Sequence, residues 1–405
     1  MMRKEDFTEK APGRVVPAAG FPGIVAFVPN LLPREIELPT SISMKIEVAA
    51  GLIGKLAGEA AILNPWVHLF LRREAIASSA IEGTITTARE LYAFEAGEVA
   101  DGAHHEKEVL NYVNAATRGL ELIGERGMSL NVLREIHEVM MTGVRGSGKR
   151  PGEFRKEQNA ISHTKRIEDA RFVPPPVPQM YEALHDLETF IHEPPTMPAL
   201  IRLALTHYQF ETIHPFLDGN GRVGRLMLPL LLCTWGTLPH GPPKLYLSSY
   251  LEKNDEEYKH RLLRVSQNGE WNEWNAFFLE AVIAEATETL RKIKELSELR
   301  GAYIRHVSEG PAKLRDAVSY LFFKSPVVQV KDISNFTGLT RQRSGEYIEK
   351  MVELKMLTPG EKKWGRLYFA NEIMQVFFGE DAGRPNAVPE EPTSDAPEGA
   401  ATPRR

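Results

Sequence analysis

The stretch at residues 214–225 reads HPFLDGNGRVGR, and it says more about fold and chemistry than any other part of the chain. It follows a helical pattern that ends at Ile213. Its glycines around Asn220 let backbone N–H groups approach a ligand closely. The residues from 221 to 233 then read as a new helix, whose N-terminal N–H groups form an anion site. The stretch therefore predicts a phosphate-binding loop between two helices.

Four side chains of this stretch suit a phosphate-transfer site. Arg222 and Arg225 are three residues apart, so they share a helical face and can clamp a polyphosphate. Asp218 is a hard oxygen ligand, suited to a Mg²⁺ ion that bridges phosphates. His214 can accept a proton near neutral pH. Together they predict a phosphate-transfer site with its own base.

Two nucleotide-binding fingerprints match the glycine spacing of the chain, but their surroundings do not fit. GNGRVG at 219–224 satisfies a dinucleotide fingerprint, yet it follows a helix rather than a strand. GVRGSGK at 143–149 resembles the start of a P-loop, yet the next residue, Arg150, cannot ligate Mg²⁺. A third alternative is that His214 and the arginines only cap and solvate a helix. The density of glycine and polar positions in one short stretch argues against it.

The first 300 residues show no alternation of strands and helices, which predicts a mainly α body. A Pro- and Gly-rich stretch at 1–35 suggests a flexible N-terminal arm. Helical patterns then define an N-terminal helical domain at 36–122 and a core with its following helices at 123–300. Within this core, residues 158–173 lack helical periodicity and run into three prolines, which fits a short β-hairpin flap.

Residues 311–379 change character. Three helical patterns at 314–323, 330–336 and 341–356 precede a short strand at 364–370, which predicts a winged-helix domain. Its third helix opens with Arg341, Gln342 and Arg343. Eight basic and five acidic residues in 331–366 permit DNA binding, although many winged helices contact proteins instead.

Composition limits the remaining function classes. The formal net charge of −5 argues against a protein that binds nucleic acid by bulk charge alone. The single cysteine, Cys233, excludes an intrachain disulfide framework. No apolar region follows the N-terminus, and no stretch approaches the ~20 apolar residues of a membrane span, so we expect a cytoplasmic protein without a membrane partner. Five prolines, six acids and no aromatic residue at 380–405 predict a disordered tail.

The stretch 214–225 matches, position by position, the HPFx(D/E)GNGRxxR signature of the Fic family, and the chain resembles that family over about residues 36–300. The resemblance implies a Fic-fold helical bundle that transfers AMP from ATP to a Ser, Thr or Tyr hydroxyl of a target protein. His214 would be the catalytic base and Asp218 the Mg²⁺ ligand. The implied ATP-binding residues are Gly219, Asn220, Gly221, Arg222, Val223, Gly224 and Arg225.

A second resemblance lies upstream. SSAIEG at 78–83 resembles the (S/T)xxxE(G/N) inhibitory motif of the same family, beginning at Ser78. The resemblance implies that Glu82 pairs with Arg225 and displaces the γ-phosphate of ATP, because a carboxylate competes with phosphate for a guanidinium. Taken alone, Glu82 would be a solvated charge at a helix end.

The family resemblance also implies partners. PGEFR at 151–155 resembles the segment before the target-docking flap, so the target would pair with 158–173 by β-augmentation. Tyr258 is a candidate to stack on adenine, and a helix–helix contact is an equal alternative. Self-modification, a homodimer and removal of AMP with the help of Glu82 stay open. A different class of function is a DNA-binding transcriptional regulator that uses the Fic core as a nucleotide sensor.

Overall fold

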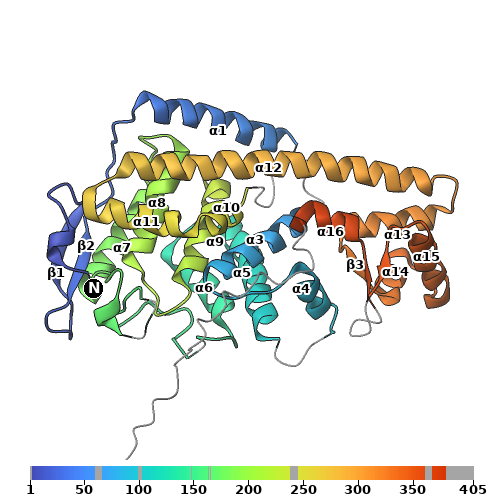
Figure 1. Ribbon diagram of the computed structural model, residues 1–405, viewed down its shortest axis with the longest axis horizontal. Coiled ribbons are helices and arrows are strands. Elements are labelled where there is room, and N and C mark those ends of the chain that lie inside the picture. The colour runs from blue at the N-terminus through green and yellow to red at the C-terminus, as the bar shows by residue number, and fades with distance from the viewer. Residues whose placement is uncertain are drawn as a thin grey trace, which may run out of the picture.

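The computed structural model describes residues 2–59, 66–98, 103–146, 148–162, 164, 166–237, 245–360 and 367–379. The expected tail at 380–405 lies outside the described residues. Helices dominate what is described, as the sequence predicts (Figure 1). The helices of the body are α1 (Thr40–Gly58), α3 (Val67–Ile81), α4 (Ala88–Glu95), α5 (His104–Arg126), α6 (Leu130–Met141), α7 (Val177–His192), α8 (Ala199–Ile213), α9 (Asn220–Thr234), α10 (Ser248–Lys253), α11 (Asp255–Asn268) and α12 (Trp271–His306).

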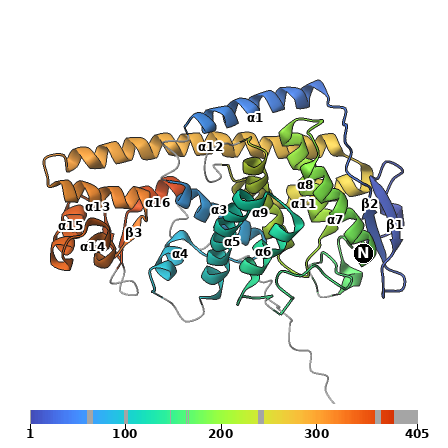
Figure 2. The same cartoon turned by 180° about the vertical axis from the view of Figure 1, so that it is seen from behind.

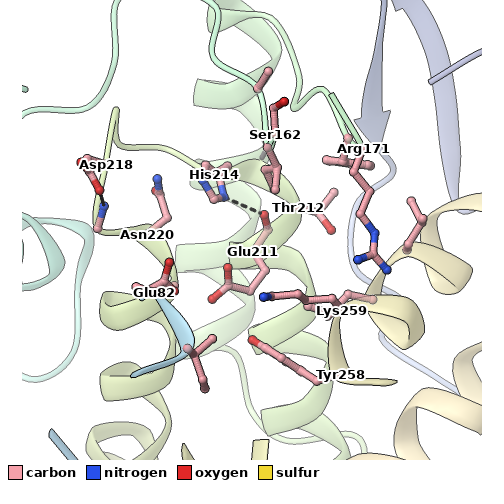
Figure 3. A pocket seen from close by; sticks show the side chains of 18 of the residues that line it. Glu82, Ser162, Arg171, Glu211, Thr212, His214, Asp218, Asn220, Tyr258 and Lys259 are labelled. Atoms are coloured by element: carbon pink, nitrogen blue, oxygen red, sulfur yellow. Dashed lines mark hydrogen bonds between the residues drawn. The ribbon is translucent and has the colours of Figure 1, made fainter. Parts of the chain in front are cut away.

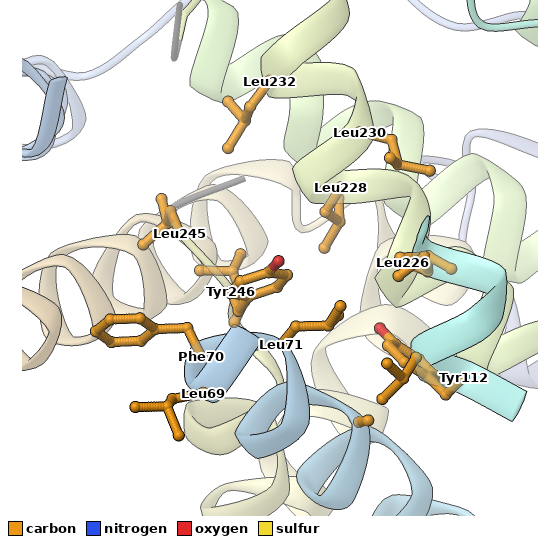
Figure 4. Packing of buried hydrophobic residues seen from close by; sticks show 14 of the residues in the cluster. Leu69, Phe70, Leu71, Tyr112, Leu226, Leu228, Leu230, Leu232, Leu245 and Tyr246 are labelled. Atoms are coloured by element: carbon orange, nitrogen blue, oxygen red, sulfur yellow. The ribbon is translucent and has the colours of Figure 1, made fainter. Parts of the chain in front are cut away.

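The centre of the body is the pair α8 and α9. Every residue of α8 except Ala199 and Glu211 is buried, because neighbouring helices cover it on all sides. Leucines of α9 face α3 and α5, where Leu69, Leu71 and Tyr112 lie (Figure 4). Each fully buried leucine contributes roughly 1.5–3 kcal/mol. This packing gives the loop between α8 and α9 two rigid supports.

The long helix α12 connects the body to the C-terminal unit. The sequence predicts one helix over 255–299, but the structure has two, because the chain turns at Gly269 with a φ of 68° between α11 and α12. Along much of its length α12 packs against α1, which lies on its outer side (Figures 1 and 2). The far end of α12 runs beyond the expected boundary, to His306.

The N-terminal residues differ from the expected flexible arm. The strands β1 (Gly13–Pro17) and β2 (Val25–Pro29) form an antiparallel hairpin. Phe27 is fully buried and its ring lies 5.9 Å from that of Phe172 in the flap. The prolines and glycines thus mark turns rather than disorder. The expectation was wrong here because the apolar partners of this short hairpin lie far away in the sequence.

The flap joins this hairpin to the body. Ile161 and Phe172 form an antiparallel bridge, which closes the predicted hairpin at its base. The backbone N–H of Phe27 donates to the carbonyl of Val173 at 2.9 Å, so β2 continues the flap on one side. The side chain of Arg155 then ties the flap to the α8–α9 loop by donating to the carbonyls of Pro175 and His214.

The C-terminal unit has the three expected helices and a fourth, α16 (Asn371–Phe378), that the sequence patterns did not predict. It contains α13 (Ala312–Phe323), α14 (Val330–Thr337), α15 (Arg341–Glu353) and α16, with the short strands β3 (Val327–Val328), β4 (Thr358–Pro359) and β5 (Tyr368–Phe369) in the order β3-β5-β4. Residues 361–366, which include the start of the expected strand, lie outside the described residues. The assignment of this unit as a winged helix stays a prediction. Helix α16 packs against α3 through Phe377 and Phe70, whose rings are 4.8 Å apart.

Candidate functional site

A cavity of about 530 Å³ lies beside the loop between α8 and α9. The end of α3, the flap, the loop itself and α11 line it (Figure 3). Apolar side chains of the flap and α11 line one side of it together with Arg171 and Lys259, and the loop lines the other side. Eight predicted site residues line the cavity. Three of them are Glu82, Arg225 and Tyr258. The other five precede Arg222 in the motif: His214, Asp218, Gly219, Asn220 and Gly221.

Local hydrogen bonds hold the loop in shape. The Asn220 side chain accepts from the backbone N–H of Phe216 and donates to its carbonyl, both at 2.8 Å. This amide therefore holds the loop in shape. Gly219 begins α9 with a φ of 77°, a left-handed conformation that favours glycine. The first N–H groups of α9, which have no partner within the helix, lie at the cavity.

His137 supports this loop from α6, although nothing in the sequence singled it out. Its Nδ1 accepts from the backbone N–H of Gly152 at 2.9 Å, so Nε2 carries the proton and donates to the carbonyl of Asp218 at 3.0 Å. Its ring stacks on Phe216 at 3.8 Å. Burial lowers the pKa of His137 to about 4, which keeps the imidazole neutral.

His214 has the state that a base needs. It ends α8 in a left-handed conformation, and its Nδ1 lies 3.3 Å from the carbonyl of Glu211. A carbonyl only accepts, so Nδ1 carries the proton and Nε2 has the lone pair. Burial lowers the pKa of His214 to about 4, and this outweighs the opposite effect of Glu82. The imidazole is therefore neutral at physiological pH.

Arg225 is a buried cation that lines the cavity. Its Nε donates to Ser78 Oγ at 2.9 Å, and its Nη2 donates to the Ser78 carbonyl and to Glu82 Oε1, both at 2.8 Å. Burial raises the pKa of Glu82, but the attraction of Arg225 outweighs it and the net pKa is lowered. Glu82 is therefore ionised, and 37% of its side chain stays exposed.

Arg222 departs from the prediction of two arginines that clamp one polyphosphate. Its side chain is buried behind the loop, where Nη1 lies 3.3 Å from Glu108 Oε2 and Nη2 lies 3.4 Å from Met141 Sδ. It does not line the cavity. Shared helical spacing placed the two Cα atoms correctly, but the buried carboxylate of Glu108 turns this guanidinium away from the cavity.

Three further predicted site residues make packing contacts within the protein: Val223, Gly224 and Tyr258. Val223 is fully buried in the core. Gly224 lies on the face of α9 toward Glu211 and leaves no room for a Cβ. Tyr258 lines the cavity, but its hydroxyl is 2.8 Å from His207 Nε2 and its ring stacks on that histidine. The alternative of a helix–helix contact therefore describes much of what Tyr258 does.

The surroundings of Asp218 fit a Mg²⁺ ion that shares its coordination with phosphates. Its Oδ1 accepts from the backbone N–H of Gly219 at 2.7 Å, which orients the carboxylate at the cavity. Magnesium needs few protein carboxylates when phosphates supply other ligands. Across the described ranges, no group of three or more His, Cys, Asp or Glu side chains forms a metal site. Asp218 would thus hold the ion together with a bound nucleotide.

Glu211 lines the cavity, although the sequence motifs did not include it. It is one turn before His214 on α8, its Oε1 is buried, and this atom has no hydrogen-bond partner among the described residues. Burial raises the pKa of Glu211 to about 7; Arg225 opposes this rise and Glu82 adds to it. No signal in the sequence indicated it, because other polar residues also lie among the apolar residues of α8: Arg202, His207 and Gln209.

Comparisons with known proteins agree with this geometry. Residues 44–121 match the model of the Fic/DOC family N-terminal domain, and residues 127–232 match that of the Fic/DOC family. A probable protein adenylyltransferase from Aquifex aeolicus is 36% identical over 69 residues, which are 17% of this chain and 22% of the relative. A protein adenylyltransferase from Drosophila erecta is 27% identical over 184 residues, 43% of this chain and 34% of the relative. The chain thus spans at most about a third of the length of these curated relatives.

A solved structure resembles most of the chain. The crystal structure of a Fic family protein from Desulfovibrio desulfuricans has a TM-score of 0.54 at 20% identity, and the match covers 83% of this chain and 97% of that one. This likeness confirms the predicted fold of the helical body. No helix in the described part of the chain is both long and apolar enough to cross a membrane.

Proposed function

The chain belongs to the Fic family, and from this premise we propose that it is an autoinhibited, Mg²⁺-dependent protein adenylyltransferase. It would transfer AMP from ATP to a Ser, Thr or Tyr hydroxyl of a target protein or of the chain itself. The observation that carries the proposal is the neutral His214, which shares one cavity with the Arg225 guanidinium and the N-terminus of α9.

The proposed reaction uses these groups as follows. Nε2 of His214 accepts the proton of the target hydroxyl, whose oxygen attacks the α-phosphorus of ATP. The bond from this phosphorus to the bridging oxygen breaks, and pyrophosphate leaves. The backbone N–H groups of residues 220 and 221 stabilise the charge on the α-phosphate, and Arg225 binds the departing phosphates. A Mg²⁺ ion on Asp218 would neutralise further phosphate charge.

Glu82 supports the inhibited state of the proposal. Its carboxylate occupies Arg225 from the cavity side, where the γ-phosphate of ATP would bind. An ATP molecule has to displace this carboxylate or bind in another pose. A hydrogen bond to a charged group contributes roughly 1.5–3 kcal/mol, so loss of Glu82 would raise the rate of transfer by roughly 10- to 100-fold.

The flap supports the proposed docking of the target. Val173 on one side of the flap already accepts from Phe27, so that side is paired. The segment 160–162 on the other side lines the cavity. An extended target segment would therefore pair with residues 160–162 and present its hydroxyl to His214. In this proposal the docking strand would lie on the side of the flap that faces the base.

The test measures transfer of label from α-labelled ATP to proteins of a lysate and to the chain itself. We expect Glu82→Gly to raise labelling and Glu82→Gly/His214→Ala to abolish it. His185→Ala, which changes an exposed histidine of α7, is the matched control for His214→Ala. Glu82→Gly/His185→Ala should label like Glu82→Gly. Labelling that persists without His214 would refute the mechanism.

The same site also supports AMP removal, as a second activity of the proposal. Glu82 carries a partly exposed carboxylate in the cavity, where it could orient a water molecule for hydrolysis. Purified labelled target is incubated with the wild type and with Glu82→Gly. Release of AMP by the wild type alone supports this activity, and equal release by both proteins contradicts it.

A second candidate function, DNA binding, is favoured by the exposed start of α15. Arg341, Gln342 and Arg343 are all exposed there, and Thr340 caps the helix by accepting from the N–H of Arg343. In this alternative the Fic core senses the nucleotide and α15 binds DNA. A salt-dependent mobility shift that is lost in Arg341→Ala/Arg343→Ala would support it, and no shift at low salt would exclude it.

A further inference from the structure

Two carboxyl groups rest on the same face of α9, one helical turn apart. A Cβ at Gly221 would lie 2.2 Å from Glu82 Oε1, and a Cβ at Gly224 would lie 2.2 Å from Glu211 Oε1. Residues three apart share a helical face. Each glycine therefore leaves space for one carboxyl group, and Arg225 follows immediately after the second glycine. In Figure 3 the Glu211 side chain extends from α8 toward Glu82.

The two carboxyl groups differ in their bonding. Glu82 Oε1 accepts from Arg225, whereas the buried Oε1 of Glu211 has no hydrogen-bond partner in the part of the chain that the structure describes. A buried polar atom without a partner costs roughly 1–3 kcal/mol, and more when it is charged. The site therefore keeps a polar group at a cost to stability, which is typical of a group that meets its partner in a ligand.

Charged and titratable groups face Glu211 from every neighbouring element. Arg225 on α9, Glu82 after α3 and Tyr258 on α11 interact with it electrostatically. His214 follows it by one turn. Lys259 and Arg171 also line the cavity, but Lys259 Nζ bonds to Asp255 at 2.6 Å and Arg171 pairs with Glu256 on α11. Asp218 lines the cavity as well, away from Glu211 (Figure 3). Burial raises the pKa of Glu211 to about 7, against the effect of Arg225.

We propose that Glu211 binds the nucleotide as a neutral carboxylic acid, whose O–H donates to a phosphate oxygen. This inference rests on the proposed function, because it takes the cavity to be the nucleotide site. It assigns Glu211 a binding role beside Arg225, in which nucleotide binding and uptake of one proton are coupled.

The physical reason lies in the charge that a phosphate brings. A phosphate that replaces the Glu82 carboxylate on Arg225 lies beside Glu211 and carries at least as much negative charge. An ionised Glu211 would repel it, whereas a protonated Glu211 donates a hydrogen bond to it. Above the pKa of the free protein, binding must therefore take up a proton, and affinity falls as the pH rises.

The experiment measures binding of the α,β-methylene analogue of ATP with Mg²⁺ by calorimetry, because this analogue cannot release pyrophosphate. Affinities are compared at about pH 6.5 and about pH 8.5 for the wild type and Glu211→Gln, whose amide is a permanently neutral donor. Relative to Glu211→Gln, the wild type should lose roughly 30-fold in affinity over this range. Heats in buffers of different ionisation enthalpy should show about one proton taken up by the wild type alone.

Two further variants keep the result interpretable. Glu211→Ala lacks the donor, so its affinity should be weak and without the extra pH dependence. Glu256→Gln removes a carboxylate charge from an exposed position, 85% accessible and outside the cavity lining, and should behave like the wild type. Parallel pH curves for the wild type and Glu211→Gln would overturn the inference about Glu211 but not the proposed nucleotide site. No nucleotide binding by any variant would overturn the nucleotide site, and the inference with it.

Discussion

Two arginines one turn apart on α9 each pair with a glutamate, and the two pairs differ in what covers the carboxylate. The Arg222–Glu108 pair is closed, with side-chain exposures of 2% and 3%. The Arg225–Glu82 pair is open on one side, because Arg225 is 2% exposed and Glu82 is 37% exposed. Both guanidinium groups are equally buried, so the difference lies in the carboxylates alone.

This difference separates a structural pair from an exchangeable one. The Arg222 guanidinium contacts Glu108 and Met141 and does not line the cavity. A ligand can reach Arg225 by replacing Glu82 from the cavity, while Ser78 keeps the guanidinium in place. The pair that borders the cavity is thus suited to regulation, and the closed pair to holding α5 against α9.

The largest expected effect tests the closed pair. Glu108→Ala leaves the Arg222 guanidinium buried without its carboxylate, which should cost about 3–5 kcal/mol of unfolding free energy. Glu82→Ala is the matched change in the open pair and should cost less, about 1.5–3 kcal/mol, because Arg225 keeps its bonds to Ser78 and borders the cavity. Denaturant unfolding followed by tryptophan fluorescence measures both. Equal losses would show that the two pairs do not differ as described.

A smaller effect concerns His137, which supports the loop between α8 and α9. Its folded pKa of about 4 is below the ordinary value of 6.5, so the unfolded chain binds the extra proton as the pH falls. The neutral His137 therefore stabilises the fold fully above pH 6.5. As the pH falls toward 4, about 3 kcal/mol of unfolding free energy is lost. His137→Gln should flatten this part of the pH profile by about one proton in denaturant unfolding. An unchanged slope would mean that His137 is not held neutral.

The smallest effect concerns the hydrogen bond that holds Arg225 of the open pair to the Ser78 hydroxyl. Ser78→Ala removes the hydroxyl that accepts from Arg225 Nε, while the Ser78 carbonyl and Glu82 remain. Loss of about 1 kcal/mol should loosen the pair and raise labelling from α-labelled ATP roughly fivefold. Ser79→Ala is the control, because within the described residues the Ser79 hydroxyl is buried without a hydrogen-bond partner. Equal labelling by both variants would contradict a role for the Ser78 hydroxyl.

The sequence by itself determined the helical body and the motif at 214–225. These inferences succeed because short spacings within a helix or a tight loop are set locally, by backbone geometry that neighbouring residues alone dictate. The helix α6, for example, has the bounds that its periodicity predicts. The pairing of Glu82 with Arg225 came from a family resemblance rather than from spacing.

The tertiary structure alone decided the partners across long separations. It placed Glu108 against Arg222, His137 behind Asp218, the hairpin of Phe27 on the flap, and the Glu211 carboxyl on Gly224. Which side chains meet between distant segments depends on how whole helices pack, and one sequence does not specify that packing residue by residue. The same physics explains why Arg222 and Arg225, identical in type and one turn apart, end in a closed pair and an open one.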